Sequence, residues 1–158
     1  MSTEIKRRIF LKRSLAAGTV GVAAAAGLLA PQQVLAAWNK EAFEAKELPA
    51  ALNALLGSSD TANSAEINVK APDIAENGAV VPVTIDTSLK DVESISIVAS
   101  NNPVPLVANF ILGTGAQGFV STRIKMGKTG DVIGIVKAGG KLHSAKKEVK
   151  VTIGGCGG

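Results

Sequence analysis

The chain has 158 residues and a formal net charge of +4, and 46% of its residues are hydrophobic. Five of the 17 Lys and Arg residues and one of the 13 Asp and Glu residues lie within residues 1–36, so residues 37–158 hold 12 of each sign and carry no net charge. The basic balance therefore gives no reason to expect a nucleic-acid partner. With one cysteine and one histidine, the chain also lacks the ligands of an ordinary zinc site.

Residues 1–36 have the features of an export signal. Arg7 and Arg8, followed by Ile-Phe-Leu-Lys, match the twin-arginine motif, although Lys6 stands where Ser or Thr is usual. The weakly apolar run that follows is too short and too rich in glycine for a membrane span. Residues 34–36 (Val-Leu-Ala) then provide a cleavage site. We expect export in folded form to the periplasm by the twin-arginine route, with no membrane attachment after cleavage.

Residues 37–64 are predicted to form a helical segment and a linker. A short amphipathic helix is expected over residues 39–47, and a second one from Pro49 to a stop signal at Gly57. A polar linker follows over residues 58–64. The second helix carries one apolar stripe, which normally packs on its own domain and less often forms a subunit contact. The stripe consists of Leu48, Leu52, Leu55 and Leu56.

Residues 65–153 are predicted to form an all-β domain. Apolar and polar residues alternate in seven short segments, and the turns between them are rich in Gly, Pro and Asn, including Asn77-Gly78. Pro82 within one segment indicates an edge strand or a bulge. Seven strands at this spacing favour an immunoglobulin-like antiparallel β-sandwich. The segments centre on residues 67–69, 81–85, 94–97, 106–112, 119–126, 131–138 and 142–153.

Two glycine-containing sequences match nucleotide-binding motifs without the structural context that those motifs need. Residues 113–118 spell the dinucleotide-binding pattern, but a strand pattern follows where a helix is required. Residues 127–129 match the end of a phosphate-binding loop, but Thr122 stands in place of its first glycine. His143, the sole histidine, lies in a strand context that favours an exposed or packing role. We therefore expect no active site of the chain's own, no cofactor and no metal.

The sequence ends in Gly154-Gly155-Cys156-Gly157-Gly158, which contains the only cysteine. Glycine loses the most backbone entropy on ordering, so residues 154–158 are predicted to form a flexible arm outside the core. At about 3.3–3.6 Å per residue, the sulfur sweeps roughly 10–15 Å from the last strand. A small buried cysteine is the ordinary alternative, and it does not fit a site between glycines. An exposed cysteine is only a few per cent thiolate at neutral pH, which suits a carrier that other enzymes activate.

Charge is unevenly distributed along the mature part of the chain. Residues 37–100 hold four basic and ten acidic groups, whereas residues 101–158 hold eight basic and two acidic groups. Solvated strand faces explain most charges of this kind. The alternative is a positive field near the arm, which would attract anionic sulfur groups or an acidic partner.

The leader and the terminal GGCGG together resemble the SoxY family. Further matches are residues 75–83 (AENGAVVPV), 102–106 (NPVPL) and 122–126 (TRIKM), so that the resemblance covers essentially the whole chain. SoxY is the sulfur-carrier subunit of the periplasmic thiosulfate-oxidising Sox system. The resemblance implies an immunoglobulin-like fold, a heterodimer with SoxZ, and a substrate carrier that is not itself an enzyme.

The resemblance also implies the chemistry. Cys156 would hold the substrate covalently on the glycine arm while SoxAX joins thiosulfate to it through the sulfane sulfur and SoxB hydrolyses off sulfate. Where the host has SoxCD, the remaining sulfane would be oxidised further. The alternative function is a periplasmic interaction module whose cysteine forms a structural cross-link to another subunit. Sulfur adducts on Cys156 would indicate the carrier, and a permanent protein–protein disulfide would indicate the module.

Overall fold

The structure, a computed structural model, describes residues 39–152. It begins with two short helices, α2 (Lys40–Glu44) and α3 (Leu48–Leu56). Asn39 joins them, because its Oδ1 accepts a hydrogen bond from the N–H of Ala42 at 3.0 Å while its Nδ2 donates to the carbonyl of Ala54 at 2.7 Å. The first helix is shorter than the predicted 39–47, since the backbone of Ala45 is already extended.

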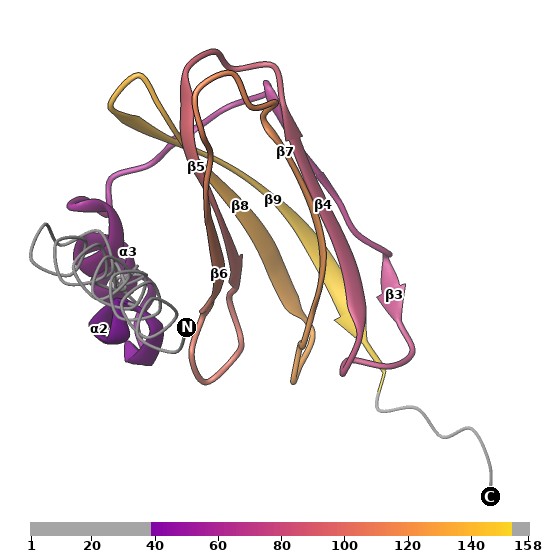
Figure 1. Cartoon of the computed structure of the whole chain (residues 1–158). Coiled ribbons are helices and arrows are strands. Elements are labelled where there is room, and N and C mark those ends of the chain that lie inside the picture. The colour runs from indigo at the N-terminus through magenta and orange to yellow at the C-terminus, as the bar shows by residue number, and fades with distance from the viewer. Residues whose placement is uncertain (1–38, 153–158) are drawn as a thin grey trace, which may run out of the picture. The chain divides into compact units, whose positions relative to one another are not determined.

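Nine strands within the described residues form two sheets (Figure 1). One sheet has the order β1-β9-β8-β5-β6, with β3 also paired to β9, and the other has the order β2-β4-β7. The strands are β1 (Ala62–Asn63), β2 (Ile67–Lys70), β3 (Ile74–Ala75), β4 (Val81–Thr87), β5 (Val92–Ala99), β6 (Leu106–Ile111), β7 (Phe119–Ile124), β8 (Gly130–Ala138) and β9 (Lys141–Val151).

The predicted antiparallel β-sandwich is confirmed, with two additions. The seven expected strands are present, and β1 and β3 add two pieces that pair with β9 in parallel. Each added strand has only two residues, too few for an alternating pattern to be visible in the sequence. β1 lies within the segment that was expected to be a plain polar linker, and its pairing to β9 is what gives it strand structure.

Pro82 does not lie on an edge strand. β4 is the central strand of its sheet, between β2 and β7. Pro82 faces Arg123 of β7, but the pairing of β4 with β2 reaches only from Thr87 to Thr84. The strand is therefore open on its β2 side at the proline, and the missing N–H removes no bond to β2 there.

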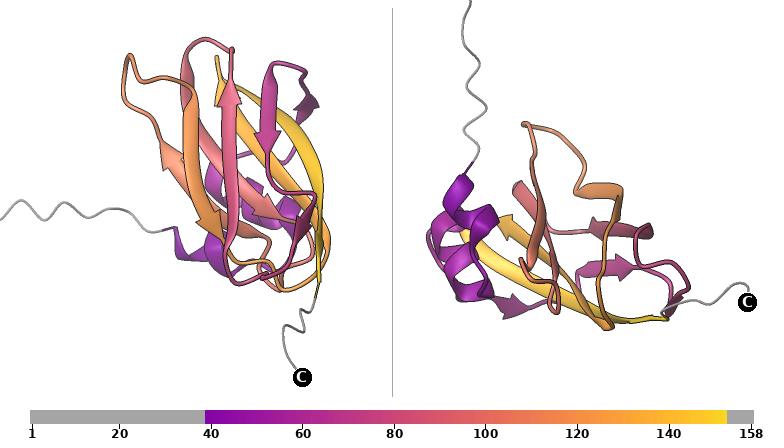
Figure 2. Two further views of the ribbon diagram at one scale, coloured as in Figure 1. Left: turned by 90° about the vertical axis from the view of Figure 1, so that its right-hand side faces the viewer. Right: turned by 90° about the horizontal axis from the view of Figure 1, so that it is seen from below.

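Figures 1 and 2 show the two sheets packed face to face. The main core consists of buried side chains that both sheets contribute. Gly134 of β8 allows close approach of the sheets, because a Cβ there would lie 2.7 Å from Cδ1 of Ile85 in β4. The fully buried members of this core come from both sheets and include Val81, Val83, Ile85, Ile95, Ile97, Val132, Val136 and Val149.

The helices cover the outer face of the larger sheet (Figure 2). Leu52 of α3 is 2% exposed and packs with Val98 and Ile135, which point outward from β5 and β8. This second layer explains why β5 is buried from Ser94 to Ala99 without alternation, since both of its faces are covered. The leucine stripe therefore packs on its own domain, with Leu52 buried and Leu48, Leu55 and Leu56 half-buried.

Candidate functional site

The residues predicted to carry function lie outside the described part of the chain. These are Cys156, the arm glycines Gly154, Gly155, Gly157 and Gly158, and the export-signal residues Arg7 and Arg8. The structure does describe the point from which the arm departs, which is the end of β9 and Thr152. We call this strand end, together with the turn before β4 (residues 76–80), the β5–β6 loop (residues 100–105) and the β7–β8 loop (residues 125–129), the tail root.

At the tail root, β9 is held on both sides. Gly130 of β8 faces Val149 across one edge, and Ala75 of β3 faces Val151 across the other. The N–H of Val151 donates to Oγ1 of Thr129 at 2.9 Å, and the N–H of Thr152 donates to the carbonyl of Ala75 at 3.1 Å. Hydrogen bonds therefore hold the chain up to Thr152, the final described residue.

The turn before β4 packs directly against this strand end. The carbonyl of Gly78 accepts a hydrogen bond from the N–H of Met126 at 2.7 Å. A Cβ on Gly78 would overlap the carbonyl oxygen of Met126 and would lie 2.8 Å from Cγ1 of Val151. Because the φ angle of Gly78 is not positive, glycine is required there by close packing and not by backbone conformation.

A pair of asparagines ties the β5–β6 loop to the β7–β8 loop. Nδ2 of Asn102 donates to the carbonyl of Lys125 at 2.8 Å, and its Oδ1 accepts from the N–H of Gly127 at 2.9 Å. Nδ2 of Asn101 donates to the carbonyl of Thr129 at 2.7 Å. Between these loops lies an open hollow of about 490 Å³, lined by Asn101, Asn102, Pro103, Gly127 and Lys128.

Three sequence segments that were singled out separately meet at the tail root. Residues 75–83 run from β3 into β4, residues 102–106 form the β5–β6 loop and enter β6, and residues 122–126 end β7 (Figure 1). Sequence reasoning did not bring them together, because their proximity depends on strand order. The one sequence signal of this proximity is the Asn-Asn-Pro turn at residues 101–103. The side chain of Asn102 in that turn forms hydrogen bonds to a loop more than twenty residues away.

The two nucleotide-motif look-alikes are loops. Residues 113–118 connect β6 to β7, and β7 begins directly at Phe119, so no helix follows the glycines. Residues 127–129 lie between β7 and β8. His143 is half-buried in β9, opposite Val136 of β8.

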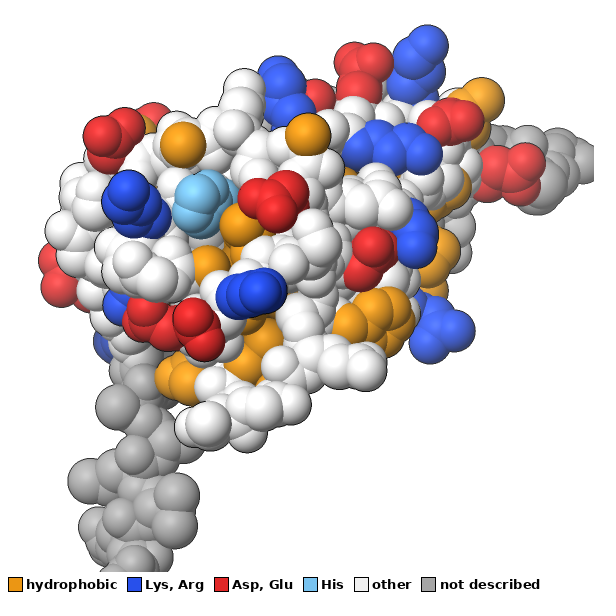
Figure 3. Space-filling view, turned by 90° about the horizontal axis from the view of Figure 1, so that it is seen from above, with side chains coloured by type: hydrophobic (Ala, Val, Ile, Leu, Met, Phe, Trp, Pro, Cys, Tyr) orange, Lys and Arg blue, Asp and Glu red, His pale blue; other side chains and the backbone are white. Residues whose placement is uncertain are grey.

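The charges that are separated along the sequence are brought together by the fold. Three lysines of the basic half form ion pairs within 3.0 Å: Lys137 with Glu93, Lys146 with Asp131, and Lys147 with Asp73. Two of these three carboxylates belong to the acidic half. Figure 3 shows one face of the molecule, where acidic and basic side chains are interspersed and neither sign covers the surface.

The pKa values of two ionisable side chains are shifted by their hydrogen-bond partners. The pKa of Glu93 is lowered because its carboxylate accepts hydrogen bonds from Lys137 and from the N–H of Gly140. The pKa of Lys146 is raised by its hydrogen bond to Asp131. Both are exposed structural pairs that link neighbouring strands, so neither indicates a catalytic acid or base.

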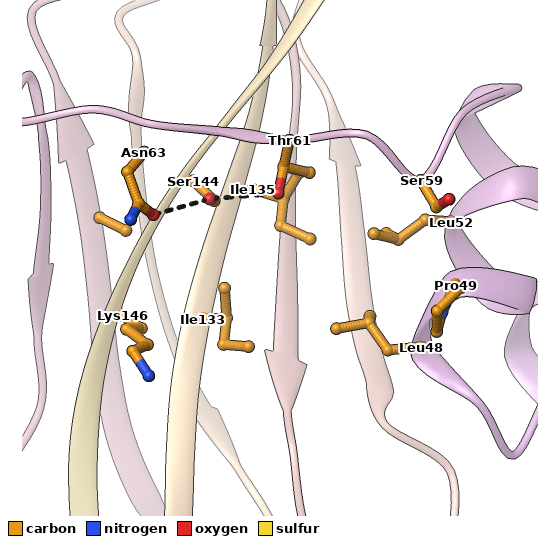
Figure 4. A pocket seen from close by; sticks show the side chains of 11 residues that line it. Leu48, Pro49, Leu52, Ser59, Thr61, Asn63, Ile133, Ile135, Ser144 and Lys146 are labelled. Atoms are coloured by element: carbon orange, nitrogen blue, oxygen red, sulfur yellow. Dashed lines mark hydrogen bonds between the residues drawn. The ribbon is translucent and has the colours of Figure 1, made fainter.

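A second hollow, of about 180 Å³, lies between α3 and the larger sheet. Figure 4 shows Leu48 and Leu52 of α3 facing Ile133 and Ile135 of β8. Ser144 of β9 also lines the hollow, within hydrogen-bond distance of Thr61 and Asn63. The lining holds no nucleophile–base pair, and its one lysine, Lys146, is paired to Asp131.

Within residues 39–152, no group of three or more His, Cys, Asp or Glu side chains could hold a metal ion. Over the same range, the structure has no helix with the length and apolarity needed to cross a membrane.

A family model described as "Sulfur oxidation protein SoxY" matches residues 52–156. The match includes the tail root and extends to the cysteine. A solved structure, the sulfur carrier protein SoxY from Chlorobium limicola f thiosulfatophilum, is 47% identical to this chain, with a TM-score of 0.59. The alignment covers 65% of this chain and 94% of that protein.

More distant matches carry no argument about function. A superoxide reductase (neelaredoxin) from Ignicoccus hospitalis is 17% identical, with a TM-score of 0.48, over 54% of this chain and 80% of that one. The PmoD soluble domain from Methylocystis sp. is 13% identical, with a TM-score of 0.38, over 54% of this chain and 90% of that one. No curated protein matches the chain.

Proposed function

Because the chain belongs to the SoxY family of sulfur oxidation proteins, we propose that it carries sulfur intermediates covalently on Cys156 during thiosulfate oxidation. The observation that carries the proposal is the family match over residues 52–156, which reaches the only cysteine of the chain. The tail root supports it, because β9 is paired up to the residues from which the glycine-flanked cysteine continues.

The proposed cycle needs chemistry from partner enzymes. The thiolate of Cys156 and thiosulfate form a sulfur–sulfur bond, giving Cys–S–S–SO₃⁻ and releasing two electrons, which SoxAX accepts. Water then cleaves the terminal S–SO₃ bond in SoxB, which releases sulfate and leaves a persulfide on the carrier. Where the host has SoxCD, that sulfane is oxidised further. The carrier supplies the nucleophilic sulfur and presents the bound group to the partner enzymes, and the partner enzymes catalyse each step.

The first prediction tests the covalent role. Cys156→Ser keeps the size of the side chain but replaces the soft sulfur nucleophile with a hydroxyl. We expect thiosulfate-dependent turnover of the reconstituted system to vanish, with the melting temperature unchanged. Intact-mass analysis should detect thiosulfate adducts on the wild-type protein and none on the variant.

Full turnover by Cys156→Ser would refute the carrier role. A permanent disulfide from Cys156 to another subunit, found in cells oxidising thiosulfate, would instead favour the structural cross-link.

We also propose that the chain works as a heterodimer with a SoxZ partner in the periplasm. Leu52 of the leucine stripe is buried within the domain, so we propose that the partner contacts another surface. Two exposed apolar side chains support a contact at the edges of the sandwich. Ile111 on edge strand β6 is 84% exposed, and Phe119 on edge strand β7 is 53% exposed. Isolated exposed apolar residues are common, but here both lie on edge strands, each of which is paired on one side only.

The second prediction tests this assembly. Co-expressed with SoxZ, the chain should elute in size exclusion as one complex near the sum of the two masses. The double variant Ile111→Asp/Phe119→Asp should dissociate the complex, because it introduces charge into a contact that excludes water. The matched control is Val80→Asp, which alters an exposed apolar residue at the tail root. Elution of the wild-type chain as a monomer beside SoxZ would contradict the heterodimer.

A further inference from the structure

We propose that Asn77 is a latent modification site: its side chain can cyclise with the backbone of Gly78 and lose ammonia, and the packing of the tail root holds it unreactive. Asn77-Gly78 is the only Asn-Gly pair in the sequence, and Asn77 is exposed to water. The inference is independent of the carrier function, because it concerns a reaction that the fold restrains and that needs no partner enzyme.

The reaction consumes only water. The backbone nitrogen of Gly78 attacks Cγ of the Asn77 side-chain amide, a carbon–nitrogen bond forms, and the side-chain nitrogen leaves as ammonia with the proton of the Gly78 N–H. Water then opens the resulting five-membered succinimide ring at either carbonyl, which gives aspartate or isoaspartate. Glycine favours the attack, because it has no Cβ beside the nitrogen and the widest range of backbone conformations.

Two hydrogen bonds within the turn oppose ring closure. Oδ1 of Asn77 accepts from the N–H of Ala79 at 2.9 Å, and the main-chain carbonyl of Asn77 accepts from the N–H of Val80 at 3.2 Å. To form the five-membered ring, the side-chain amide of Asn77 and the peptide group between residues 77 and 78 must both rotate until the Gly78 nitrogen meets Cγ. That rotation breaks both hydrogen bonds.

The tail root resists the rotation, because Gly78 has no room to move. A Cβ on Gly78 would overlap the carbonyl oxygen of Met126 and would lie 2.8 Å from Cγ1 of Val151. The carbonyl of Gly78 also accepts from the N–H of Met126 at 2.7 Å. Asn102 holds the two residues that flank Met126, through hydrogen bonds of 2.8 and 2.9 Å. Ring closure therefore requires a local opening of the tail root.

The products do not fit the closed tail root. Isoaspartate routes the main chain through the former side chain and lengthens the turn by one methylene group. Both products carry a carboxylate where a neutral amide stood. A longer turn cannot keep Gly78 between Met126 and Val151, where the packing already excludes a Cβ. Deamidation of Asn77 therefore marks molecules whose tail root has opened.

The test follows deamidation of the purified protein during incubation at mildly alkaline pH. Mass spectrometry of the digested protein separates the peptide that contains Asn77 from its aspartate and isoaspartate forms. A synthetic peptide of residues 73–82 gives the rate without tertiary structure. We expect the folded protein to react at least about tenfold more slowly than this peptide. Equal rates in the protein and the peptide would overturn the inference.

Matched variants test whether the tail root sets the rate. Asn102→Ala removes the two hydrogen bonds that hold the β7–β8 loop, so Asn77 should react about five- to thirtyfold faster than in the wild type. Thr129→Val removes the acceptor of the Val151 N–H and should also react faster, by a smaller factor. Asn39→Ala likewise removes two hydrogen bonds, but in the helical layer, and should react at the wild-type rate.

Melting curves establish which variants are folded at the incubation temperature, and Thr129→Val carries the comparison if Asn102→Ala does not fold. Wild-type rates in every folded variant of the tail root would overturn the inference. Equal acceleration by Asn39→Ala and the tail-root variants would also overturn it, because global unfolding would then expose the site. Neither result bears on the carrier role, which depends on Cys156.

Discussion

At Gly78, the backbone of one turn lies closer to two strand ends than any side chain would allow. The Asn77-Gly78 pair reads in the sequence as a turn, and it is one: Oδ1 of Asn77 accepts from the N–H of Ala79 at 2.9 Å. The reason for the glycine could not be read locally, because the atoms that exclude a Cβ belong to Met126 and Val151. Gly57 is the opposite case, since its helix-ending role depends only on its own φ of 79° and was predicted.

The third prediction concerns this contact. Gly78→Ala should destabilise the protein by about 1–3 kcal/mol, because the added methyl group forces the tail root apart. Gly113→Ala is the matched control: its φ is not positive and a Cβ there meets nothing within 4 Å, so its effect should stay within about 0.5 kcal/mol. Urea unfolding of both variants provides the measurement. Equal free energies of unfolding for Gly78→Ala and Gly113→Ala would contradict the prediction, because they would show that the turn accommodates the methyl group without loss of stability.

At the scale of elements, alternation predicted every strand of four or more residues. It could not predict β1 and β3, which are strands only because β9 offers them a free edge. It also could not order the strands. Pro82 therefore indicated an edge strand or a bulge, whereas β4 lies in the centre of its sheet, pairs with β7 without a register shift at Pro82, and is open toward β2 only at its first residues. The same limit hid the tail root, whose parts are distant in sequence.

The fourth prediction concerns the link between β5 and the β8–β9 hairpin. The pKa of Glu93 is lowered in the folded state, so its ionised form contributes stability that is complete above the ordinary value of 4.5 and is lost as pH falls through the lowered pKa. Glu93→Gln should therefore lower the melting temperature at pH 7, and the difference from wild type should close in acid.

Glu76→Gln is the control, since Glu76 is exposed and forms no ion pair with a described residue. A melting-temperature difference for Glu93→Gln that stays constant down to pH 2 would mean that the ion pair contributes nothing.

At the scale of the whole molecule, folding pairs part of the basic half of the sequence with the acidic half. Lys137 and Lys147 of the basic half neutralise Glu93 and Asp73 of the acidic half. Counts of charged residues along the sequence could not reveal these ion pairs, because the two side chains of each pair are more than forty residues apart. Lys128, at the tail root, is exposed and forms no ion pair with a described carboxylate.

The fifth prediction concerns export. If the leader uses the twin-arginine route, Arg7→Lys/Arg8→Lys keeps the charge but removes the recognised side chains. Full-length precursor should then accumulate in the cytoplasm, as detected by fractionation and mass spectrometry. Lys6→Arg, a similar change beside the motif, should be exported and cleaved. Normal periplasmic accumulation of the double variant would exclude this route.

The pairing of β9 on both sides up to the tail root has a mechanical consequence. In the proposed cycle, a partner enzyme that draws Cys156 into its cleft would pull on the chain, and the load would pass to the end of β9. Where that pull runs along the strand, the hydrogen bonds to β8 and β3 lie across the force and bear it together in shear. An unpaired strand end would instead peel away one bond at a time. If the proposed carrier role holds, the sandwich would act as an anchor under tension while a partner enzyme acts on the group carried by Cys156.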